Sequence, residues 1–411
     1  MPVFKPFKGV RPHQDYLDCF PTHPLSNFTP EEIKEKAKEE YSYVKMVSPY
    51  LFEEEDYRKS LSVVRANYEQ FITEKKLLQD EFCYYLYSQK LPDGRVFRGL
   101  LGLVSVKDYN EGKIKKHEET LTHRKDKLSR YLDQVNLQAE PVLLTYPVND
   151  ELETLMDNEE KQLPIVDYID SKGAQYKIWK IANQPDLQKF EQILSNVDAF
   201  YIADGHHRMG ATALCSERKA EQNANHTGEE PYNFVYGFIV SEKSIKINDF
   251  NKAITDLNGL TSQEFLEKVK EKFFVEEKGI EPYFPAQKQH ISMYLDGVFY
   301  DLQPKEKCCG GACLDIIDHY LLEKHILQPI LGITDLKTSK RVDYQRGTSC
   351  IEGIKKLKAK VDSGKYKVAF GAYPVSFEDL IEVADKNLKM PPKCTYIEPK
   401  LITALIIYDM K

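Results

Sequence analysis

The sequence predicts an α/β (α+β) protein built of two successive layers, each combining a sheet with helices. In the first 240 residues, short apolar and aromatic runs alternate with segments of helical periodicity. A second series of strand and helix patterns follows from about residue 241. The 411 residues suffice for two or three domains, and 42% hydrophobic with 29% charged residues is ordinary for a soluble protein. We therefore expect domains at 1–240, including an N-terminal arm, and at 241–411, closing over the site.

The first half opens with a proline-interrupted arm and continues with helices and strands. Thr29, Pro30 and Glu32 form a capping-box pattern that indicates a helix start. Strand-like runs on both sides of a Pro-Asp-Gly turn predict a hairpin. The expected helices cover residues 57–78, 114–135, part of 150–161, and 184–194. The expected strands cover residues 82–87, 97–106, 139–146, 175–180, 197–201 and 234–240.

The second half has the same mixture of signals. Thr261 and Glu264 form a second capping box, before a helix over 265–274. Asp296-Gly297 between two apolar runs is a strong hairpin signal. Further elements are expected as a helix over 314–327, a strand over 368–373, a helix capped by Ser376, and a final strand over 401–408.

The segment 202–208, Ile-Ala-Asp-Gly-His-His-Arg, is the part of the chain most in need of a functional explanation. It follows an apolar strand pattern and precedes a small, apolar helix pattern, so it lies at a strand-to-helix turn. Such a turn favours an anion, because backbone N–H groups and the helix dipole point at it. Two imidazoles and a guanidinium add to that preference. The alternative is a capping aspartate followed by solvated side chains, but a cap needs neither both histidines nor the arginine.

His117-Glu118 is the second pair that we single out. A carboxylate at a helix start is common because it complements the helix dipole, which would explain Glu118 without any function. The nearby Lys115, Lys116, His123 and Arg124 make the region basic. This pattern fits a polyanion beside the carboxylate and equally a solvated surface.

The composition limits the classes of function. A net charge of −7 argues against a non-specific nucleic-acid binder. The N-terminus lacks a signal-peptide core, and no apolar run is long enough to span a bilayer. Eight scattered cysteines indicate reduced thiols and a cytoplasmic protein. The cysteine cluster within 308–313 matches no zinc or iron–sulfur spacing and is interpreted as a loop.

Several motifs together resemble the free L-serine kinases of the SerK type, in the ParB/sulfiredoxin-like superfamily, and their larger relatives in the DUF 1015 family. The main matching motifs are the 204–208 segment and the His117-Glu118 pair upstream of it. Further matches lie at residues 5–12, 108–120, 331–333 and 390–400. The resemblance implies a ParB/sulfiredoxin-like mixed-sheet first half followed by a second α+β domain. The chain departs from the family at 21–26, where Pro-Thr-His-Pro-Leu-Ser replaces a common Pro-Tyr-Asp-Val.

The resemblance also implies an activity, its cofactors and its residues. The chain is expected to transfer a phosphoryl group from ATP or ADP, with Mg²⁺, to the hydroxyl of free L-serine. Glu118 would act on that hydroxyl. Catalytic roles are also implied for Asp204, which would hold the metal, and for His206 and His207. The implied phosphate- and nucleotide-binding residues are His117, Gly205, Arg208, Lys393, Thr395 and Lys400.

Other functions remain open from the residues alone. A metal-dependent phosphoester hydrolase would use Asp204, His206 and His207 as ligands, although successive helical side chains point about 100° apart. A non-catalytic nucleotide-binding regulatory protein and a catalytically inactive relative are further alternatives. The chain has neither a P-loop sequence nor the protein-kinase motifs. The expected partners are serine and nucleotide, without nucleic acid or membrane, and a homodimer is left open.

Overall fold

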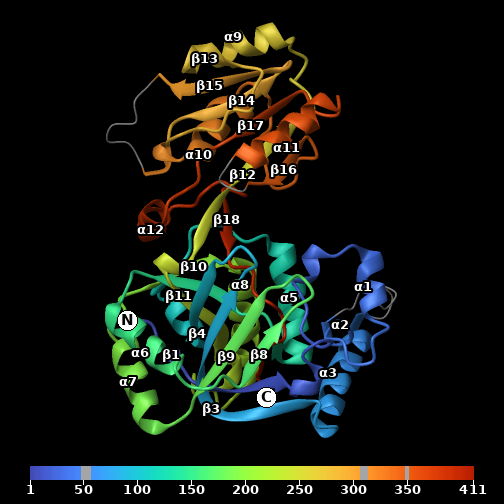
Figure 1. Cartoon of the computed structure of the whole chain (residues 1–411), viewed down its shortest axis with the longest axis vertical. Coiled ribbons are helices and arrows are strands. Elements are labelled where there is room, and N and C mark those ends of the chain that lie inside the picture. Colours follow the sequence, from blue (N-terminus) through green and yellow to red (C-terminus); the bar gives the residue numbers. More distant parts are fainter. Residues whose placement is uncertain (48–56, 306–312, 348–350) are drawn as a thin grey trace. The chain divides into compact units, whose positions relative to one another are not determined.

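The computed structural model describes residues 1–47, 57–305, 313–347 and 351–411, and it confirms a mixed α+β fold (Figure 1). The chain divides into two compact units. Unit 1 comprises Met1–Lys115, Thr120–Ile245 and Pro399–Lys411, and unit 2 comprises Lys116–Glu119 and Lys246–Glu398. This division differs from the expected 1–240 and 241–411, because a short segment before Thr120 belongs to unit 2 and the last residues return to unit 1.

Unit 1 is organised around a mixed sheet, for which the described residues provide twelve strands. The main path runs β5-β10-β7-β11-β4-β3-β2-β19-β6, while β1 pairs with β4, and β9 pairs with β3 and β8. The strands are β1 Phe4–Lys5, β2 Phe7–Pro12, β3 Leu77–Lys90, β4 Val96–Ser105, β5 Ile114–Lys115, β6 Leu137–Gln138, β7 Val142–Tyr146, β8 Val166–Ile169, β9 Gln175–Ile181, β10 Phe200–Asp204, β11 Phe234–Ser241 and β19 Ile407–Asp409.

Helices cover this sheet because their apolar stripes match its buried side chains. One core joins β10 and β11 to the helices that follow β7 and β9, through Met156 and Phe190 among others. A second core joins β2 and β19 to the long helix that precedes β3. The helices are α1 Pro30–Lys36, α2 Val44–Val47, α3 Tyr57–Thr73, α4 Val106–Asn110, α5 Thr122–Val135, α6 Asp150–Glu159, α7 Gln184–Leu194 and α8 His206–Gln222.

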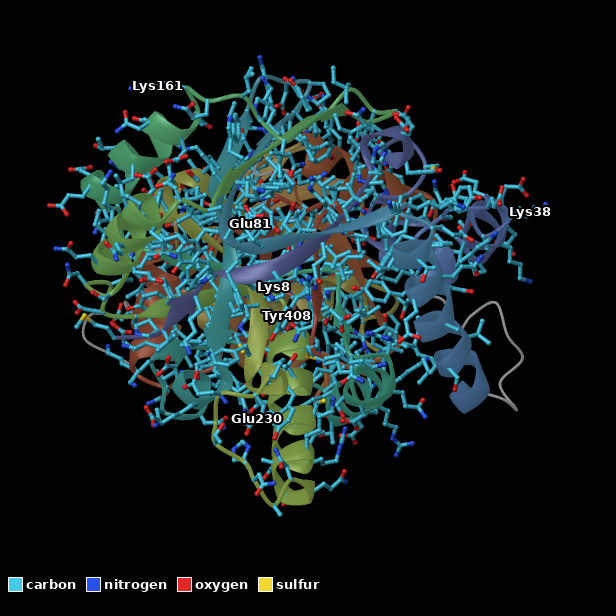
Figure 2. The ribbon with its side chains drawn as sticks, turned by 90° about the horizontal axis from the view of Figure 1, so that it is seen from below. Lys8, Lys38, Glu81, Lys161, Glu230 and Tyr408 are labelled. Carbon is cyan, nitrogen blue, oxygen red and sulfur yellow. The ribbon has the colours of Figure 1, made fainter. Side chains whose placement is uncertain are left out.

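The C-terminal end of the chain completes unit 1 by strand pairing. Tyr408 of β19 stands opposite Gly9 of β2 in an antiparallel register, and Figure 2 shows Lys8 and Tyr408 close together on these strands. β19 also pairs with β6. Arg65 of α3 donates from Nη1 and Nη2 to the two carboxylate oxygens of Asp409, at 2.8 and 3.0 Å. This bidentate geometry fixes the returning strand against α3.

Several predicted elements of unit 1 have different limits in the structure. The helix predicted over 114–135 begins only at Thr122, since Ile114 is buried as part of β5 and pairs with Phe200 of β10. His117 and Glu118 therefore do not lie at a helix start. The helix predicted to reach residue 78 ends at Thr73, and Leu77 already belongs to β3. The strand predicted over 139–146 is confined to β7, Val142–Tyr146, and a separate short strand, β6, precedes residue 139.

Unit 2 contains a second sheet, to which the described part of the chain contributes seven strands. Its order is β13-β15-β14-β17-β12-β16, with β18 paired to β12. The strands are β12 Lys246–Ile254, β13 Phe273–Gly279, β14 Ile291–Leu295, β15 Val298–Pro304, β16 Val342–Arg346, β17 Val368–Gly371 and β18 Thr395–Glu398. The helices are α9 Ser262–Lys272, α10 Asp318–Leu322, α11 Ile351–Asp362 and α12 Phe377–Asp385, with a π-helical turn, η8, at Glu323–Leu327.

Both faces of the second sheet are covered, and successive residues of one strand face opposite cores. On β12, Ile254 packs in the core formed with α9, α10 and η8, whereas Ala253 packs in the core formed with α11. Val368 and Ala369 of β17 alternate in the same way. By this alternation Lys252 shares the face of Ile254, which lies under α10 and η8.

The predictions for unit 2 were partly right. The 291–302 hairpin and the capping boxes at Thr261 and Ser376 are confirmed, as is the capping box at Thr29 in unit 1. The helix predicted over 314–327 is instead a 3₁₀ turn, α10 and η8 in series. The final strand is confined to β19, and β12, β13, β16, β18 and α11 were not predicted. Residues 308–312 of the cysteine cluster lie outside the described residues.

None of the helices in the described ranges combines the length and the apolar character that a membrane crossing requires.

The contact between β4 and β11 provides a test of the fold of unit 1. A Cβ atom at Gly99 would lie 2.2 Å from the backbone oxygen of Ile239, so the two strands would have to separate. We expect Gly99→Ala to lower the free energy of unfolding by about 1–3 kcal/mol, as overpacking does. At Gly237 the nearest atom would be a Leu144 methyl group at 3.3 Å, and Gly237→Ala is the matched control with a smaller effect. Urea unfolding of both variants measures the difference, and equal stabilities would contradict the packing.

Candidate functional site

The β10–α8 turn, residues 204–208, is the strand-to-helix turn that the sequence predicts. β10 ends at Asp204, and α8 begins at His206. Gly205 is the N-cap residue and has φ +98°, a left-handed conformation that glycine adopts without strain. A side chain there would also meet the Arg208 guanidinium, since a Cβ atom would lie 3.0 Å from Nε. Asp204 is thus the last strand residue and not the cap of α8.

The ion pair between Asp204 and Lys400 joins this turn to the C-terminal segment. Lys400 Nζ donates to Asp204 Oδ2 at 2.5 Å, within unit 1. Burial acts to raise the pKa of Asp204, but Lys400, Arg208 and His206 outweigh it and hold that pKa well below its usual range. Asp204 is therefore ionised at neutral pH, surrounded by positive charge.

Arg208 folds back from the first turn of α8 towards Gly205. Its Nη1 atom donates to the backbone oxygen of Pro141 at 2.7 Å and forms an ion pair with Glu140 at 2.9 Å. The guanidinium has five N–H donors in a fixed fork, so these contacts on one nitrogen orient it without using all of its donors. The imidazoles of His206, which is buried, and His207, which is half-buried, begin the same helix. The first-turn N–H groups of a helix have no intrahelical partner and suit an anion.

The turn does not contain a ready-made metal centre. Among the described side chains, no three His, Cys, Asp or Glu residues are grouped so that they could hold a metal ion. The ligand set expected for a metal-dependent hydrolase, Asp204 with His206 and His207, is therefore not assembled. Mg²⁺ makes a different demand, because it is commonly held by one or two carboxylates together with water and substrate phosphates. The ionised Asp204 fits that requirement.

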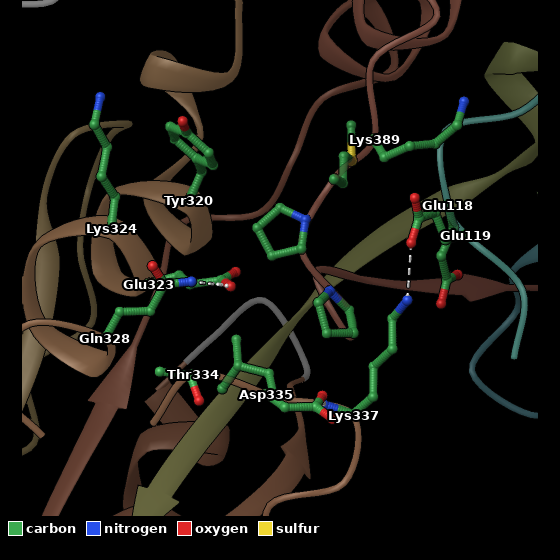
Figure 3. Close-up of a pocket in the computed structure, with 14 residues that line it drawn as sticks. Glu118, Glu119, Tyr320, Glu323, Lys324, Gln328, Thr334, Asp335, Lys337 and Lys389 are labelled. Atoms are coloured by element: carbon green, nitrogen blue, oxygen red, sulfur yellow. Dashed lines mark hydrogen bonds and ion pairs between the residues drawn. The ribbon is translucent and has the colours of Figure 1, made fainter. Parts of the chain in front are cut away.

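A second group of candidate residues surrounds a pocket of about 500 Å³ within unit 2. Figure 3 shows Glu118, Glu119 and Lys337 facing Glu323 and Gln328 from the opposite side of the pocket. Charged side chains of both signs line it. They are Glu118, Glu119, Glu323, Lys324, Asp335, Lys337 and Lys389. A lining with both signs of charge suits a small polar ligand that itself carries both signs.

The charges in this pocket are partly engaged by their neighbours. Lys337 Nζ donates to Glu119 at 3.1 Å, and Lys324 donates to Asp315 at 3.0 Å. Lys389 donates to the backbone oxygen of Lys116 at 2.9 Å. Burial and the nearby Lys116 lower the pKa of Lys389. Glu118 is half-buried in the wall, on a segment fixed by the bond from Met390 N to His117 O at 2.9 Å.

A buried polar cluster in unit 2 was missed by the sequence analysis. Lys252 of β12 is 1% exposed, and its ammonium group has no hydrogen-bond partner among the described residues. Burial lowers its pKa to about 8, against opposing effects of Cys394, Glu323 and Asp249. His319 of α10 is fully buried near it, and both burial and Lys252 lower the pKa of His319. Lysines are rarely buried without a partner, so Lys252 requires an explanation.

The predicted site residues thus fall into two groups. Asp204, Gly205, His206, His207, Arg208 and Lys400 belong to unit 1, whereas His117, Glu118, Lys393 and Thr395 belong to unit 2. Within unit 2, Lys393 is exposed, with its Nζ 5.2 Å from the centroid of the Phe250 ring, and Thr395 begins β18 opposite Asp249. Lys400 contacts Asp204 directly, while Lys393 and Thr395, predicted alongside it, are in the other unit.

Comparison with known proteins identifies the family. The model of a family described as "Protein of unknown function (DUF1015)" matches residues 4–331. The chain belongs to this family. The predicted membership in the larger DUF1015 family is thereby confirmed, whereas the ParB/sulfiredoxin-like relationship stays a prediction. No curated protein matches this DUF1015 chain.

Solved structures resemble the DUF1015 chain at low sequence identity. One is a free serine kinase with a glutamate-to-glutamine substitution, in complex with AMP (14% identity, TM-score 0.39, 74% of this chain and 91% of that chain). Another is SbnI with a C-terminal truncation, from Staphylococcus aureus (14%, TM-score 0.37, 72% and 82%). A third is a conserved hypothetical protein from Pyrococcus furiosus (12%, TM-score 0.37, 74% and 94%).

The buried ammonium of Lys252 leads to a stability prediction. The fall of its pKa from 10.5 to about 8 corresponds to roughly 3 kcal/mol by which burial disfavours the charged form. We expect Lys252→Met to stabilise the protein at pH 7, by up to about 3 kcal/mol. Because the folded chain binds this proton less tightly than the unfolded chain, wild-type stability rises between about pH 8 and 10.5. The difference in stability between Lys252→Met and the wild type therefore becomes smaller from about pH 8 to 10.5.

Thermal unfolding of both proteins at pH 7 and pH 10 provides the measurement. Lys367→Met, which changes the same charge on the segment leading into β17, is the control for loss of a lysine elsewhere in unit 2. A wild-type protein that is more stable than the Lys252→Met variant at pH 7 would show that the ammonium has a stabilising partner.

Proposed function

We propose that this protein is a nucleotide-dependent kinase that phosphorylates the hydroxyl of free L-serine. The observation that carries the proposal is the β10–α8 turn, where an ionised carboxylate, two histidines, an arginine and a lysine meet the start of a 17-residue helix. This arrangement suits the phosphates of a nucleotide. The sequence motifs shared with the serine kinases support the choice of acceptor.

Phosphoryl transfer demands mainly positioning and neutralisation of charge. In the proposal, the N–H groups of the first turn of α8 and the Arg208 guanidinium bind phosphate oxygens. His206 and His207 stabilise the charge on the transferred group. Lys400 holds Asp204 in place and adds a positive charge beside the phosphates. Gly205 allows the backbone to approach the nucleotide closely.

Asp204 is the proposed Mg²⁺ ligand, directly or through water. The bound cation would neutralise charge on the nucleotide phosphates. The low pKa of Asp204 keeps the carboxylate ionised throughout the physiological range, so it needs no deprotonation before binding. Lys400 would have to yield part of its contact with Asp204 when the cation binds, because both would share one carboxylate.

Glu118 is proposed to accept the proton of the serine hydroxyl or to orient that hydroxyl. Its half-buried position in the wall of a pocket with charges of both signs supports this role. The segment that carries it is fixed through the backbone of His117, which is itself buried. The additional roles expected for Lys393 and Thr395 at the phosphates stay part of the proposal.

The proposal predicts that Glu118→Gln and Asp204→Asn each abolish phosphorylation of free serine while the fold is retained. Loss of a charge contact made in the transition state typically costs about 3–4 kcal/mol, which corresponds to at least a hundredfold in rate. The assay incubates the protein with Mg²⁺, saturating ATP or ADP and a panel of free amino acids, and detects phosphoserine by mass spectrometry.

Glu119→Gln is the matched control, because Glu119 adjoins Glu118 but pairs with Lys337. We expect it to retain turnover. Circular dichroism of all three variants would establish that the fold is intact. Unchanged turnover in both Glu118→Gln and Asp204→Asn would contradict the proposed roles, and binding of nucleotide without any phosphorylated product would instead favour a regulatory protein.

A further inference from the structure

Lys252 and Glu323 connect the interior of unit 2 to its pocket. Lys252 lies on the face of β12 that α10 and η8 cover, and Glu323 is the first residue of η8. Glu323 is half-buried and lines the pocket, whereas Lys252 is buried and does not. The two side chains interact electrostatically. A buried cation without a hydrogen-bond partner among the described residues thus lies within electrostatic reach of a carboxylate at the pocket surface.

The orientation of Glu323 is already partly fixed. Gln328 Nε2 donates to its Oε1 atom at 2.9 Å, and Figure 3 shows the pair at the pocket wall opposite Glu118. Carboxylates accept up to about four hydrogen bonds, so this bond leaves Glu323 with capacity to bind a cationic group. Glu119, by contrast, is engaged by Lys337.

We propose that the pocket of unit 2 selects a substrate that carries an α-ammonium group, that Glu323 binds this group, and that Lys252 is the positioning residue that keeps the Glu323 carboxylate ionised and in place. The inference rests on the proposed function in that the substrate is a small hydroxylated amino acid. The inference adds that Glu323 distinguishes this amino acid from a hydroxy acid of similar shape that has no amine. Glu118 and Glu323 then have separate tasks, since one faces the hydroxyl and the other the ammonium group.

The charges around the pair agree with this division. Burial raises the pKa of Glu323 above its ordinary value, and Gln328, Lys252 and Lys337 offset part of that rise. Besides Glu323, Lys252 interacts electrostatically with Cys394 before β18, Asp249 on its own strand and His319 on α10, and its Nζ lies 5.8 Å from the ring centroid of Tyr344 on β16. Removal of Lys252 takes away one effect that lowers the pKa of Glu323. That pKa would therefore rise, and Glu323 would stay protonated up to a higher pH.

The test measures binding of L-serine and of glycerate to the full chain by calorimetry, without nucleotide. Glycerate has the hydroxyl and carboxylate of serine but lacks its amine. A charge-assisted hydrogen bond to the ammonium group predicts that the native chain binds serine roughly tenfold or more tightly than glycerate. In Glu323→Gln this preference should fall to near one, and in the control Glu119→Gln it should persist.

Lys252 is tested through the pH dependence of the same binding. Serine binding by the native chain should weaken as pH falls through the pKa of Glu323. Lys252→Met should move this midpoint to higher pH, and Lys252→Arg should restore it, whereas a merely structural role would change the melting temperature without moving the midpoint. Equal affinity of the native chain for serine and glycerate, no binding of serine, or an unmoved midpoint in Lys252→Met would each overturn the inference. Because no nucleotide is present, a failure of phosphoryl transfer leaves these outcomes unaffected.

Discussion

The ion pair between Asp204 and Lys400 is the constraint on which the candidate phosphate site depends. Asp204 ends a strand in the interior of the sheet of unit 1, and Lys400 stands where the chain returns to that unit before adding β19. The contact therefore forms between two segments of unit 1 that are separated in sequence by most of unit 2. It joins the N-terminal sheet, the start of α8 and the C-terminal segment, and it leaves an ionised carboxylate at a position where anions are otherwise favoured.

The two groups of candidate residues show different physical designs. At the β10–α8 turn, Arg208 and Lys400 stand beside two histidines, and the backbone itself contributes donors through Gly205 and the start of α8. The pocket of unit 2 is lined by both carboxylates and lysines, and several of them are already paired. The first design suits a polyanion, and the second suits a small ligand with charges of both signs. Burial of the Lys252 ammonium group near the pocket destabilises the folded chain. Proteins retain such destabilising residues mainly at functional positions.

Local signals in the sequence predicted those parts of the fold that depend on neighbouring residues. The capping boxes at Thr29, Thr261 and Ser376 and the hairpin around Asp296-Gly297 need only a few consecutive residues, and all are present in the structure. The helix predicted over 114–135 does not begin at Ile114, because Ile114 pairs with Phe200, which is more than 80 residues away in sequence. No local pattern shows that contact. β18 was overlooked for the same reason, because it is defined by its pairing with β12.

The candidate site shows the same limit. The turn at Gly205 was visible because strand, glycine and helix are consecutive, whereas Lys400 at Asp204 matched a family motif and had no local signal. Glu323 and Lys252 were not predicted as site residues, although a lysine at two-residue spacing between Phe250 and Ile254 was a usable sign of a buried charge. Their electrostatic interaction arises from the packing of η8 against the same core as β12, which only the tertiary structure reveals.

The most direct test of the account is a crystal structure of the full chain with ADP and Mg²⁺. The account predicts nucleotide phosphates within hydrogen-bond distance of the backbone N–H groups that begin α8, with the cation at Asp204 and the Arg208 guanidinium on a phosphate oxygen. A nucleotide bound elsewhere, with the β10–α8 turn and the Asp204–Lys400 pair unchanged, would contradict it.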